Sequence, residues 1–421
     1  MKILKIYVKL SIMKEKILER FIRYVKVNTR SMEGSDSYPS TPCQWDLLNI
    51  LKKEMEEIGL VEIELDKYGY LFGTLPSNVE KSVPPICFIA HIDTSPEVSG
   101  ENVKPIVHKN YKGGDIKLPF DNQAIKSTEN PELAKVKGHS IITSSGDTLL
   151  GADDKAGIAE ILTAIEYLIQ NPEIKHGKIR VLFTPDEETG QGTKYLDLNK
   201  IEAKFAYTVD GSSLGEVENE TFNAASMTVI AKGYNVHPGY AKDKMVNAIR
   251  ALTHFVSLLP PKKSPENTDK REGYIHPLSI QGDVSEAKVK MILRDFEWEG
   301  IEEKKNYLEK LKEIVQEIYP KTKLELQFEE QYRNMRYHLE KNPEVVNYAI
   351  EAVKRLKIKP VLKYIRGGTD GSALTLKGIL TPNIFAGGQN FHSKQEWISL
   401  EWMELATKTI IEIIKIWEEK S

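Results

Sequence analysis

The sequence predicts an α/β protein made of a large domain, with a mostly parallel central sheet flanked by helices, and an inserted α+β domain of ferredoxin-like type. Three observations predict this architecture. Between residues 84 and 211, apolar strand-like runs alternate with a helix-period segment. From about residue 222 the order becomes strand, helix, two strands, helix, strand, which is the ferredoxin-like pattern. At 421 residues the chain is also too long for one core of usual size.

The strands of the large domain are expected at 84–93, 177–188 and 204–211, and a helix at 152–170. The strands are short runs rich in Val, Ile and Phe, whereas the helix repeats apolar residues at helical spacing. In such folds the carboxyl ends of parallel strands meet at one edge of the sheet, where ligands bind. Functional residues are therefore expected where these strands end.

The inserted domain is expected at residues 222–333, and the large domain at 1–221 and 334–421. After residue 334, helix-like and strand-like segments resume the α/β rhythm. The C-terminal segment should therefore complete the sheet of the large domain.

Composition excludes several classes of protein. The chain has 58 basic and 61 acidic residues, a net charge of -3, which gives no reason to expect a nucleic-acid partner. No apolar run reaches about 18 residues, so no membrane span is expected. Only two cysteines are present and no signal-peptide cleavage site follows the N-terminus, so a cytoplasmic location is expected. Met13 precedes an amphipathic helix and is a second candidate for the first residue.

Histidines and acidic residues stand where the predicted strands end. They are His91, Asp93, Glu187, Glu188 and Asp210, with Asp153 and Asp154 at the start of the helix and His392 after a Gly-rich turn. Carboxylates gathered at one sheet edge repel one another unless cations lie among them. Histidine and carboxylate ligands without thiolates are typical of catalytic zinc or a similar metal. The sequence therefore predicts a pair of divalent metal ions at this edge.

Two adjacent aspartates, Asp153 and Asp154, are more than a helix cap requires, because one side chain satisfies that need. Two metals about 3.5–4 Å apart need a bridging carboxylate. One aspartate is therefore expected to bridge the metals and the other to cap the helix or tune its neighbour. Asp93 lies two residues from His91, on the same side of an extended segment, and is expected to hold the imidazole ring.

Longer strings, in order and over nearly the whole chain, carry a more specific signal. They are AHIDTSPEVSG, LLGADDKAGIAEI, VLFTPDEETGQG, YTVDGSSLGE, NVHPGYAKDKMVNA, LRDF, IRGGTDGSAL and NFHSKQEW. The chain resembles the tripeptide aminopeptidases of the dizinc peptidase family, which also includes carnosinase-like dipeptidases, aminoacylases and glutamate carboxypeptidases. The resemblance implies an enzyme acting on small peptides, with the inserted domain as a lid.

The resemblance also implies two zinc ions per chain, with cobalt or manganese as substitutes. Glu187 would be the general base and Asp93 the residue that orients His91; the residues alone do not decide between Glu187 and Glu188. The peptide bond after the bridging aspartate would be cis. The metal ligands would be His91 and Asp210 on one zinc, Glu188 and His392 on the other, and Asp153 between them.

Substrate-binding residues are implied in the inserted domain and in the RGGTDG string. His237 would donate a hydrogen bond to the oxyanion, and in the family this histidine comes from the same or a neighbouring chain, which suggests a homodimer. Asn247 is a further candidate. Gly367 and Gly368 would let the backbone approach the peptide closely.

Two arginines resemble the substrate clamp of the family. A planar guanidinium suits a substrate carboxylate better than an ammonium group does. Arg294 ends a predicted strand and Arg366 opens the RGGTDG string. Either could instead form a structural ion pair, since Asp295 and Asp370 lie nearby in the sequence.

The sequence leaves two alternatives to a tripeptide aminopeptidase. The nearer is a dipeptidase or N-acyl amino acid deacylase of the same family, with the same metal ligands. The more distant is a non-catalytic binding protein or a metal-dependent phosphatase on this fold. A binding protein would be expected to lose Glu187 or a ligand, and a phosphatase needs no acidic base beside an amide-sized cleft.

Overall fold

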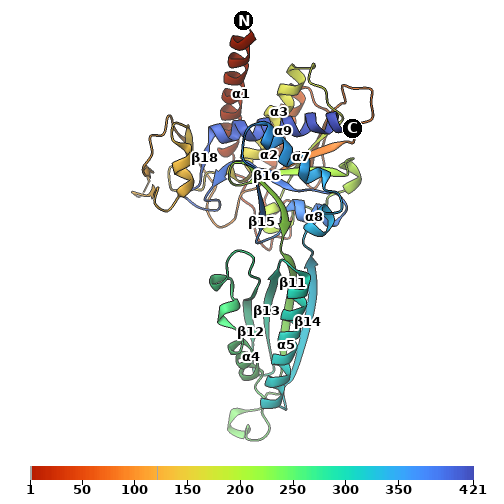
Figure 1. Ribbon diagram of the computed structural model, residues 1–421. Coiled ribbons are helices and arrows are strands. Elements are labelled where there is room, and N and C mark those ends of the chain that lie inside the picture. Colours follow the sequence, from red (N-terminus) through yellow and green to blue (C-terminus); the bar gives the residue numbers. More distant parts are fainter. Residues whose placement is uncertain (1, 121) are drawn as a thin grey trace. The chain divides into compact units, whose positions relative to one another are not determined.

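An eight-stranded sheet forms the centre of the larger of the two units into which the chain divides. The computed structural model describes residues 2–120 and 122–421, with side chains described from residue 12 onward. The larger unit spans Met1–Asn219, His338–Lys363 and Thr369–Ser421, and the smaller unit spans Glu220–Tyr337 and Tyr364–Gly368. Figure 1 shows the elements of both units.

The sheet of the larger unit is parallel at its centre and antiparallel at its edges. β3 runs parallel to β8 and β9, and β9 runs parallel to β16, whereas β1, β2 and β10 pair antiparallel. Every residue of β3 and β8 is buried, as expected for strands covered on both faces. This arrangement confirms the predicted α/β fold. In sheet order the strands are β1 (Val61–Leu65), β2 (Leu71–Leu75), β8 (Ile179–Thr184), β3 (Ile86–His91), β9 (Phe205–Gly211), β16 (Asn383–Phe385), β10 (Glu216–Thr221) and β15 (Val361–Ile365).

Helices of the larger unit pack on this sheet and on one another. α3 contacts β3 and β9 as well as α1 and α9, and α2 contacts β1 and β2. In Figure 1 the N-terminal part of α1 runs out from the rest of the unit. Within the described residues, no helix is long and apolar enough to cross a membrane. The helices are α1 (Lys2–Val25), α2 (Gln44–Ile58), α3 (Ala152–Gln170), α7 (Glu344–Arg355), α8 (Asp370–Leu376) and α9 (Leu400–Lys420), with short turns η1 (Pro131–Val136), η2 (Glu187–Thr189) and η3 (Leu198–Lys200).

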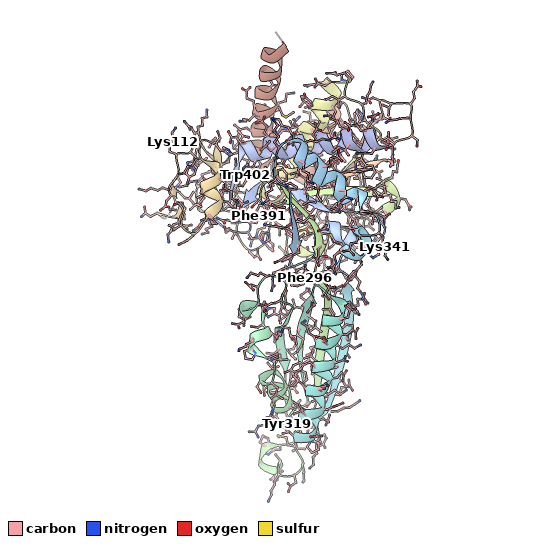
Figure 2. The ribbon with its side chains drawn as sticks, in the orientation of Figure 1. Lys112, Phe296, Tyr319, Lys341, Phe391 and Trp402 are labelled. Carbon is pink, nitrogen blue, oxygen red and sulfur yellow. The ribbon has the colours of Figure 1, made fainter. Side chains whose placement is uncertain are left out.

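A four-stranded sheet brings together two segments that lie far apart in the sequence. Its strands, in order, are β17 (Gly388–Gln389), β18 (Trp397–Ser399), β7 (Ile141–Thr143) and β4 (Ile106–His108), and a separate pair is formed by β5 (Ile116–Lys117) and β6 (Ala124–Ile125). Trp397 and Trp402 belong to an apolar core with residues of the segment between β4 and β7. In Figure 2, Trp402 lies inside the larger unit, whereas Lys112 points outward from this segment.

The smaller unit has the predicted ferredoxin-like order. Its strands β11, β12, β13 and β14 form an antiparallel sheet in the order β12-β13-β11-β14, and α4 and α5 pack on it. Alternate residues of β11, such as Met227 and Val229, are buried in the core with helix residues such as Phe255 and Leu308. Phe296 and Tyr319 mark the two ends of this unit in Figure 2. The elements are β11 (Asn223–Lys232), η4 (Pro238–Tyr240), α4 (Ala248–Ser257), η5 (Pro261–Lys263), η6 (Pro265–Asn267), β12 (Tyr274–Gly282), β13 (Glu286–Asp295), α5 (Trp298–Ile318) and β14 (Lys323–Tyr332), and α6 (Arg336–Leu339) lies where the chain leaves the unit.

One short segment lies outside the expected boundary. The prediction leaves residues 364–368 in the large domain, whereas the structure groups Tyr364–Gly368 with the smaller unit. The Tyr364 ring contacts Phe296 edge-on at 4.9 Å. The Arg366 guanidinium donates to the carbonyl groups of Lys270 and Glu272. These contacts hold the segment to the smaller unit, and the sequence order alone could not show them.

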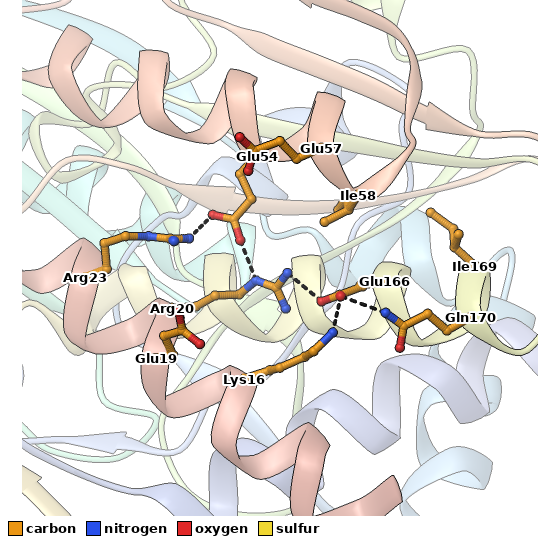
Figure 3. Close-up of a pocket in the computed structure, with 10 residues that line it drawn as sticks. All are labelled: Lys16, Glu19, Arg20, Arg23, Glu54, Glu57, Ile58, Glu166, Ile169 and Gln170. Carbon is orange, nitrogen blue, oxygen red and sulfur yellow. Dashed lines mark hydrogen bonds and ion pairs between the residues drawn. The ribbon is translucent and has the colours of Figure 1, made fainter.

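A buried arginine ties α1 to α2 and α3. Arg20 donates from Nε to Glu54 Oε1 at 2.7 Å and from Nη2 to Glu166 Oε2 at 2.7 Å, and its Nη1 donates to Thr163 Oγ1 at 2.9 Å. Figure 3 shows its guanidinium between the two glutamates. Only 7% of the Arg20 side chain is exposed. Its removal would take charged hydrogen bonds from both glutamates, although Glu54 keeps Arg23 and Tyr24 and Glu166 keeps Lys16.

We expect Arg20→Ala to lower the free energy of unfolding by about 1.5–3 kcal/mol, the range for hydrogen bonds to charged groups, because both glutamates keep a second cation. Urea denaturation measures this loss. Lys53→Ala is the matched control, because Lys53 and Glu57 form an exposed pair at 3.7 Å, and such a pair contributes about 0–1 kcal/mol. Equal losses in the two variants would contradict the assigned role of Arg20.

Candidate metal centre

The carboxyl ends of the central strands place acidic and histidine side chains at one edge of the sheet. His91 is the last residue of β3, and Asp210 lies near the end of β9. β8 ends at Thr184, and the turn η2 that follows carries Glu187 and Glu188. The parallel register pairs His91 with Thr184, so β3 and β8 end at the same level. The fold therefore gathers these residues for the reason expected from the sequence.

The two oxygens of the Asp153 carboxylate face two different histidines. Oδ1 lies 2.8 Å from His91 Nε2, and Oδ2 lies 3.4 Å from His392 Nε2. Glu188 Oε2 is 2.8 Å from the same His392 nitrogen, and Asp210 Oδ1 is 3.8 Å from His91 Nε2. Each oxygen of Asp153 thus lies beside one histidine and one further carboxylate. This is the arrangement that a bridging ligand between two metals requires.

The neighbouring aspartate is engaged by the backbone. Asp154 Oδ1 accepts from the Gly157 N–H at 3.2 Å, and Oδ2 accepts from the His91 N–H at 3.3 Å. Asp154 is fully buried. Its bond to Gly157 caps the first turn of α3, and its bond to His91 holds the end of β3. The peptide bond between Asp153 and Asp154 is cis. Because backbone N–H groups already occupy both oxygens of Asp154, Asp153 is the better candidate for the bridge.

The donor set fits a pair of divalent metals. Ligand atoms of His91, Asp154 and Asp210 lie within 4.8 Å of one another, and so, separately, do ligand atoms of His91, Asp153 and Glu188. Glu188 Oε1 is buried and has no hydrogen-bond partner among the described residues. A buried carboxylate oxygen without a partner is costly unless a cation satisfies it. Imidazole and carboxylate donors suit zinc, manganese or cobalt.

Several ionisable groups of the centre are strongly perturbed. Burial, reinforced by Asp153, raises the pKa of Glu188 to about 7, and burial beside Asp153 and Asp154 holds the pKa of Asp210 well above its usual range. Hydrogen bonds to Asp153 and Glu188 raise the pKa of His392 to about 11. For Asp153 itself, burial acts upward, but the bonds with His392 and His91 leave its pKa lowered. In the absence of cations, protons bound to these groups reduce the repulsion between the crowded carboxylates.

Asp93 joins three parts of the centre. Its Oδ1 lies 3.3 Å from His91 Nδ1 and accepts from the Glu187 N–H at 3.1 Å, and its Oδ2 accepts from the Glu188 N–H at 3.2 Å. The Asp93 side chain has no solvent exposure. A carboxylate in this position fixes the tautomer and direction of a metal-bound imidazole. Here it also fixes the backbone of both glutamates, which the sequence did not predict.

Glu187 lies beside a small cavity of 10 Å³ at the same sheet edge, lined also by His91, Asp210 and Asp370. Its Oε1 accepts from the Asp370 N–H at 3.3 Å. Burial, together with Asp370 and Glu188, holds the pKa of Glu187 well above its usual range. A carboxyl group with a raised pKa can accept a proton and release it again near neutral pH.

Two aspartates outside the predicted set support this edge. Asp186, in the left-handed region with φ 57°, accepts from the Ser40 N–H at 2.6 Å, from the Ser40 hydroxyl and from Gln44 Nε2 at 2.7 Å. The Asp370 carboxylate accepts from Thr184 Oγ1 at 2.7 Å. The Pro-Asp-Glu-Glu string offered a signal for Asp186, because Asp tolerates positive φ in tight turns.

The smaller unit places two predicted residues beside one groove. His237 and Asn247 line a groove of 750 Å³ together with Met245 and Val284. His237 Nδ1 accepts from the Gly239 N–H at 3.1 Å, which leaves its Nε2 as the possible donor. The Asn247 side chain accepts from the Arg250 N–H and caps α4. Asn247 therefore has a structural role whatever it binds.

The two predicted arginines bind carbonyl groups within the smaller unit. Arg294 Nη1 donates to the Leu293 carbonyl at 3.0 Å and to the Gln331 side chain at 3.1 Å. Arg366 donates to backbone carbonyls of the 268–272 loop. Asp295, which the alternative pairs with Arg294, forms an ion pair with Lys304. The alternative ion pair between Arg366 and Asp370 stays a prediction. Gly367 has open space around it, and a Cβ on Gly368 would meet the Tyr332 ring at 2.9 Å.

Residues 149–416 match the family model described as peptidase family M20/M25/M40. The chain belongs to this family. A Peptidase T from Geobacillus sp. (strain WCH70) is 51% identical over 410 residues, which cover 97% of this chain and 100% of that relative. A tripeptidase structure from Staphylococcus aureus superposes with a TM-score of 0.74 at 23% identity and covers 96% of this chain and 99% of that one. A dinuclear metal-binding M20 peptidase from Bacillus subtilis has a TM-score of 0.65 at 15% identity, with 96% and 98% covered.

Membership of the M20/M25/M40 family agrees with the centre described above. The matched range begins at Leu149, just before the Asp153 turn, and extends past His392. His91 and Asp93 lie before the range but within the 97% of the chain that aligns with the Geobacillus relative. The resemblance read from the short sequence strings is thereby confirmed at the level of the family.

We expect the metal-free protein to be less stable at pH 8 than at pH 5.5. The folded-state pKa values of Glu188, about 7, and His392, about 11, exceed the unfolded values of about 4.3 and 6.5. The native state therefore holds more protons in this window, and its free energy of unfolding falls as pH rises. Thermal unfolding of the metal-free protein at both pH values measures the effect.

Glu188→Gln is the control for this pH dependence, because all other titrating groups are shared with the parent. The variant should lose less stability between pH 5.5 and 8 than the parent does. Zinc should also flatten the parent's profile, since metal binding displaces the extra protons. A parent protein that gains stability over this range relative to the variant would contradict the assigned charges.

Proposed function

We propose that the chain is a metal-dependent aminopeptidase that removes the N-terminal residue from tripeptides. The observation that carries the proposal is the Asp153 carboxylate, whose two oxygens face His91 and His392 at the same sheet edge as the half-buried Glu187. A relative half identical over its whole length is named Peptidase T, and a structure of the same fold is described as a tripeptidase. Small peptides are therefore the substrate class.

Two zinc ions per chain are the proposed cofactors, with cobalt or manganese as substitutes. Two observations support two ions rather than one. Glu188 Oε1 has no hydrogen-bond partner among the described residues, and the two oxygens of Asp153 lie beside different histidines. When bound, such ions polarise the peptide carbonyl and lower the pKa of a water molecule. The proposed ligands are His91 and Asp210 for one ion, Glu188 and His392 for the other, and Asp153 for both.

Glu187 is the proposed general base and acid. Its carboxylate accepts the proton of the attacking water and later delivers it to the leaving amine. The Asp370 N–H binds Glu187 Oε1, and Asp93 binds the Glu187 N–H, so both ends of the residue are held. A fixed carboxylate does not need to reorganise during proton transfer, which is the advantage of a preorganised site.

Residues of the smaller unit are proposed to bind the substrate. His237, with Nε2 as donor, would stabilise the oxyanion, and Asn247 lies beside it in the same groove. Arg294 and Arg366 stay predictions for carboxylate binding, as do Gly367 and Gly368 for close backbone approach. Both arginines would have to exchange hydrogen bonds that they make to carbonyl groups.

A homodimer is proposed from the edge strand β12. This strand ends the sheet of the smaller unit, and Leu278 and Ile280 on it are 58% and 56% exposed. An exposed apolar edge strand is a template for pairing with another chain. Leu278→Lys with Ile280→Lys should give a monomer in sedimentation, whereas Ile318→Lys, on α5 and 52% exposed, should not change the parent's state. A parent that sediments as a monomer would contradict the proposal.

The activity is tested by release of the N-terminal residue from a free tripeptide. We expect cleavage of the tripeptide but not of its N-acetylated form, and loss of cleavage on chelation with recovery on zinc addition. Glu187→Gln should lower kcat at least about 100-fold, the scale of general acid–base catalysis, and should still bind metal because Glu187 is not a proposed ligand.

Glu19→Gln is the matched control, because Glu19 lies in α1 and lines a separate pocket with Arg20 and Glu54, away from the candidate metal ligands. Preferred cleavage of a dipeptide or an acylated amino acid would contradict the tripeptide specificity and favour the dipeptidase or deacylase alternative. A metal-loaded parent that cleaves none of these substrates would contradict a catalytic role.

A further inference from the structure

The turns that carry Asp153 and His392 are joined by one buried glutamate. Glu396 follows His392 by four residues and directly precedes β18, and only 1% of it is exposed. The residues of the turn before α3 that it contacts lie 243 to 246 positions earlier in the sequence. No proposed step in catalysis uses Glu396.

The Glu396 carboxylate binds three backbone N–H groups of that turn. Oε2 accepts from Leu150 and from Gly151, both at 2.7 Å, and Oε1 accepts from Asp153 at 3.1 Å. Hydrogen bonds to a carboxylate are stronger than those between neutral groups, particularly in a buried site. The backbone of the proposed bridging residue is thus held by a side chain from the opposite ligand loop.

The shape of the turn explains why a side chain must supply the acceptors. Gly151 lies in the left-handed region, with φ 81° and ψ 30°, and α3 has no side-chain cap from this residue. N–H groups at the start of a helix have no partner within the helix. Glu396 satisfies the N–H groups on either side of Ala152. A change in its position would therefore displace the Asp153 backbone.

The backbone of Glu396 is also held by hydrogen bonds. Its own N–H donates to the Ser393 carbonyl at 3.3 Å, and the Ser393 hydroxyl donates to the Asn390 carbonyl at 2.7 Å. Asn390 Nδ2 donates to Asn130 Oδ1 at 2.7 Å. Trp397, the next residue, pairs with Thr143 in β7 and with Gln389 in β17. His392 lies within this turn, so Glu396 and His392 belong to one hydrogen-bonded segment.

We propose that Glu396 is a positioning residue that sets the separation between Asp153 and His392 and thereby the affinity of the second metal. The inference rests on the proposed dinuclear function. Glu396 is not a proposed metal ligand; it acts through the Asp153 backbone and the His392 turn. Residues that orient ligands in this way typically change metal affinity about 10–100-fold when replaced.

The test is zinc binding to Glu396→Gln, measured by competition with a chromophoric chelator, and the visible absorption of the cobalt-loaded protein. A glutamine offers one acceptor oxygen, so its amide group must face an N–H of the turn. We expect one zinc to bind as in the parent and the second at least about 10-fold more weakly. kcat for the tripeptide should fall while KM changes little, and Glu396→Asp, which keeps both oxygens, should recover part of the affinity.

Glu216→Gln is the matched control, because Glu216 is also buried but pairs with Lys363. It should bind both zinc ions as the parent does. If Glu396→Gln loses thermal stability but binds both zinc ions with parental affinity and an unchanged cobalt spectrum, the residue is merely structural and the proposal is overturned. If Glu396→Gln does not fold, the same criteria apply to Glu396→Asp. Zinc titration needs no peptide cleavage, so a failed activity assay on the parent would leave this result readable.

Discussion

The metal centre depends on one buried carboxylate, that of Asp93. Its Oδ1 lies beside the His91 ring and accepts from the Glu187 N–H, and its Oδ2 accepts from the Glu188 N–H. A single group thereby fixes the direction of one proposed ligand and the backbone of both the proposed base and a second ligand. Loss of this interaction would disturb two neighbouring strand ends at once, β3 and β8, which the parallel register brings to the same level.

Charge balance is the second constraint on the larger unit. The sheet edge buries several carboxylates, and burial raises the pKa of Glu188 to about 7 and holds those of Glu187 and Asp210 well above their usual range. The fold tolerates this cost because protons or cations can offset it. Sites of this kind, where the structure concentrates unfavourable charge, are typical of function rather than stability.

Much of the fold and the centre could be predicted because the pattern is local. Apolar runs in the sequence predict β3, β8 and β9, and the position of His91, Glu188 and Asp210 near the ends of these strands predicts that they are neighbours. The roles of Asp93, Asp186 and Glu396 toward the backbone could not be read, because they depend on N–H groups from distant turns. The packing of Arg366 against the 268–272 loop was missed for the same reason: a carbonyl acceptor leaves no signal in the sequence.

The most direct test of this account is X-ray anomalous scattering from crystals of the zinc-loaded protein. We expect two zinc peaks about 3.5–4 Å apart, with one oxygen of Asp153 bound to each, His91 on the first ion and His392 on the second. A single peak, or two peaks without Asp153 between them, would contradict it.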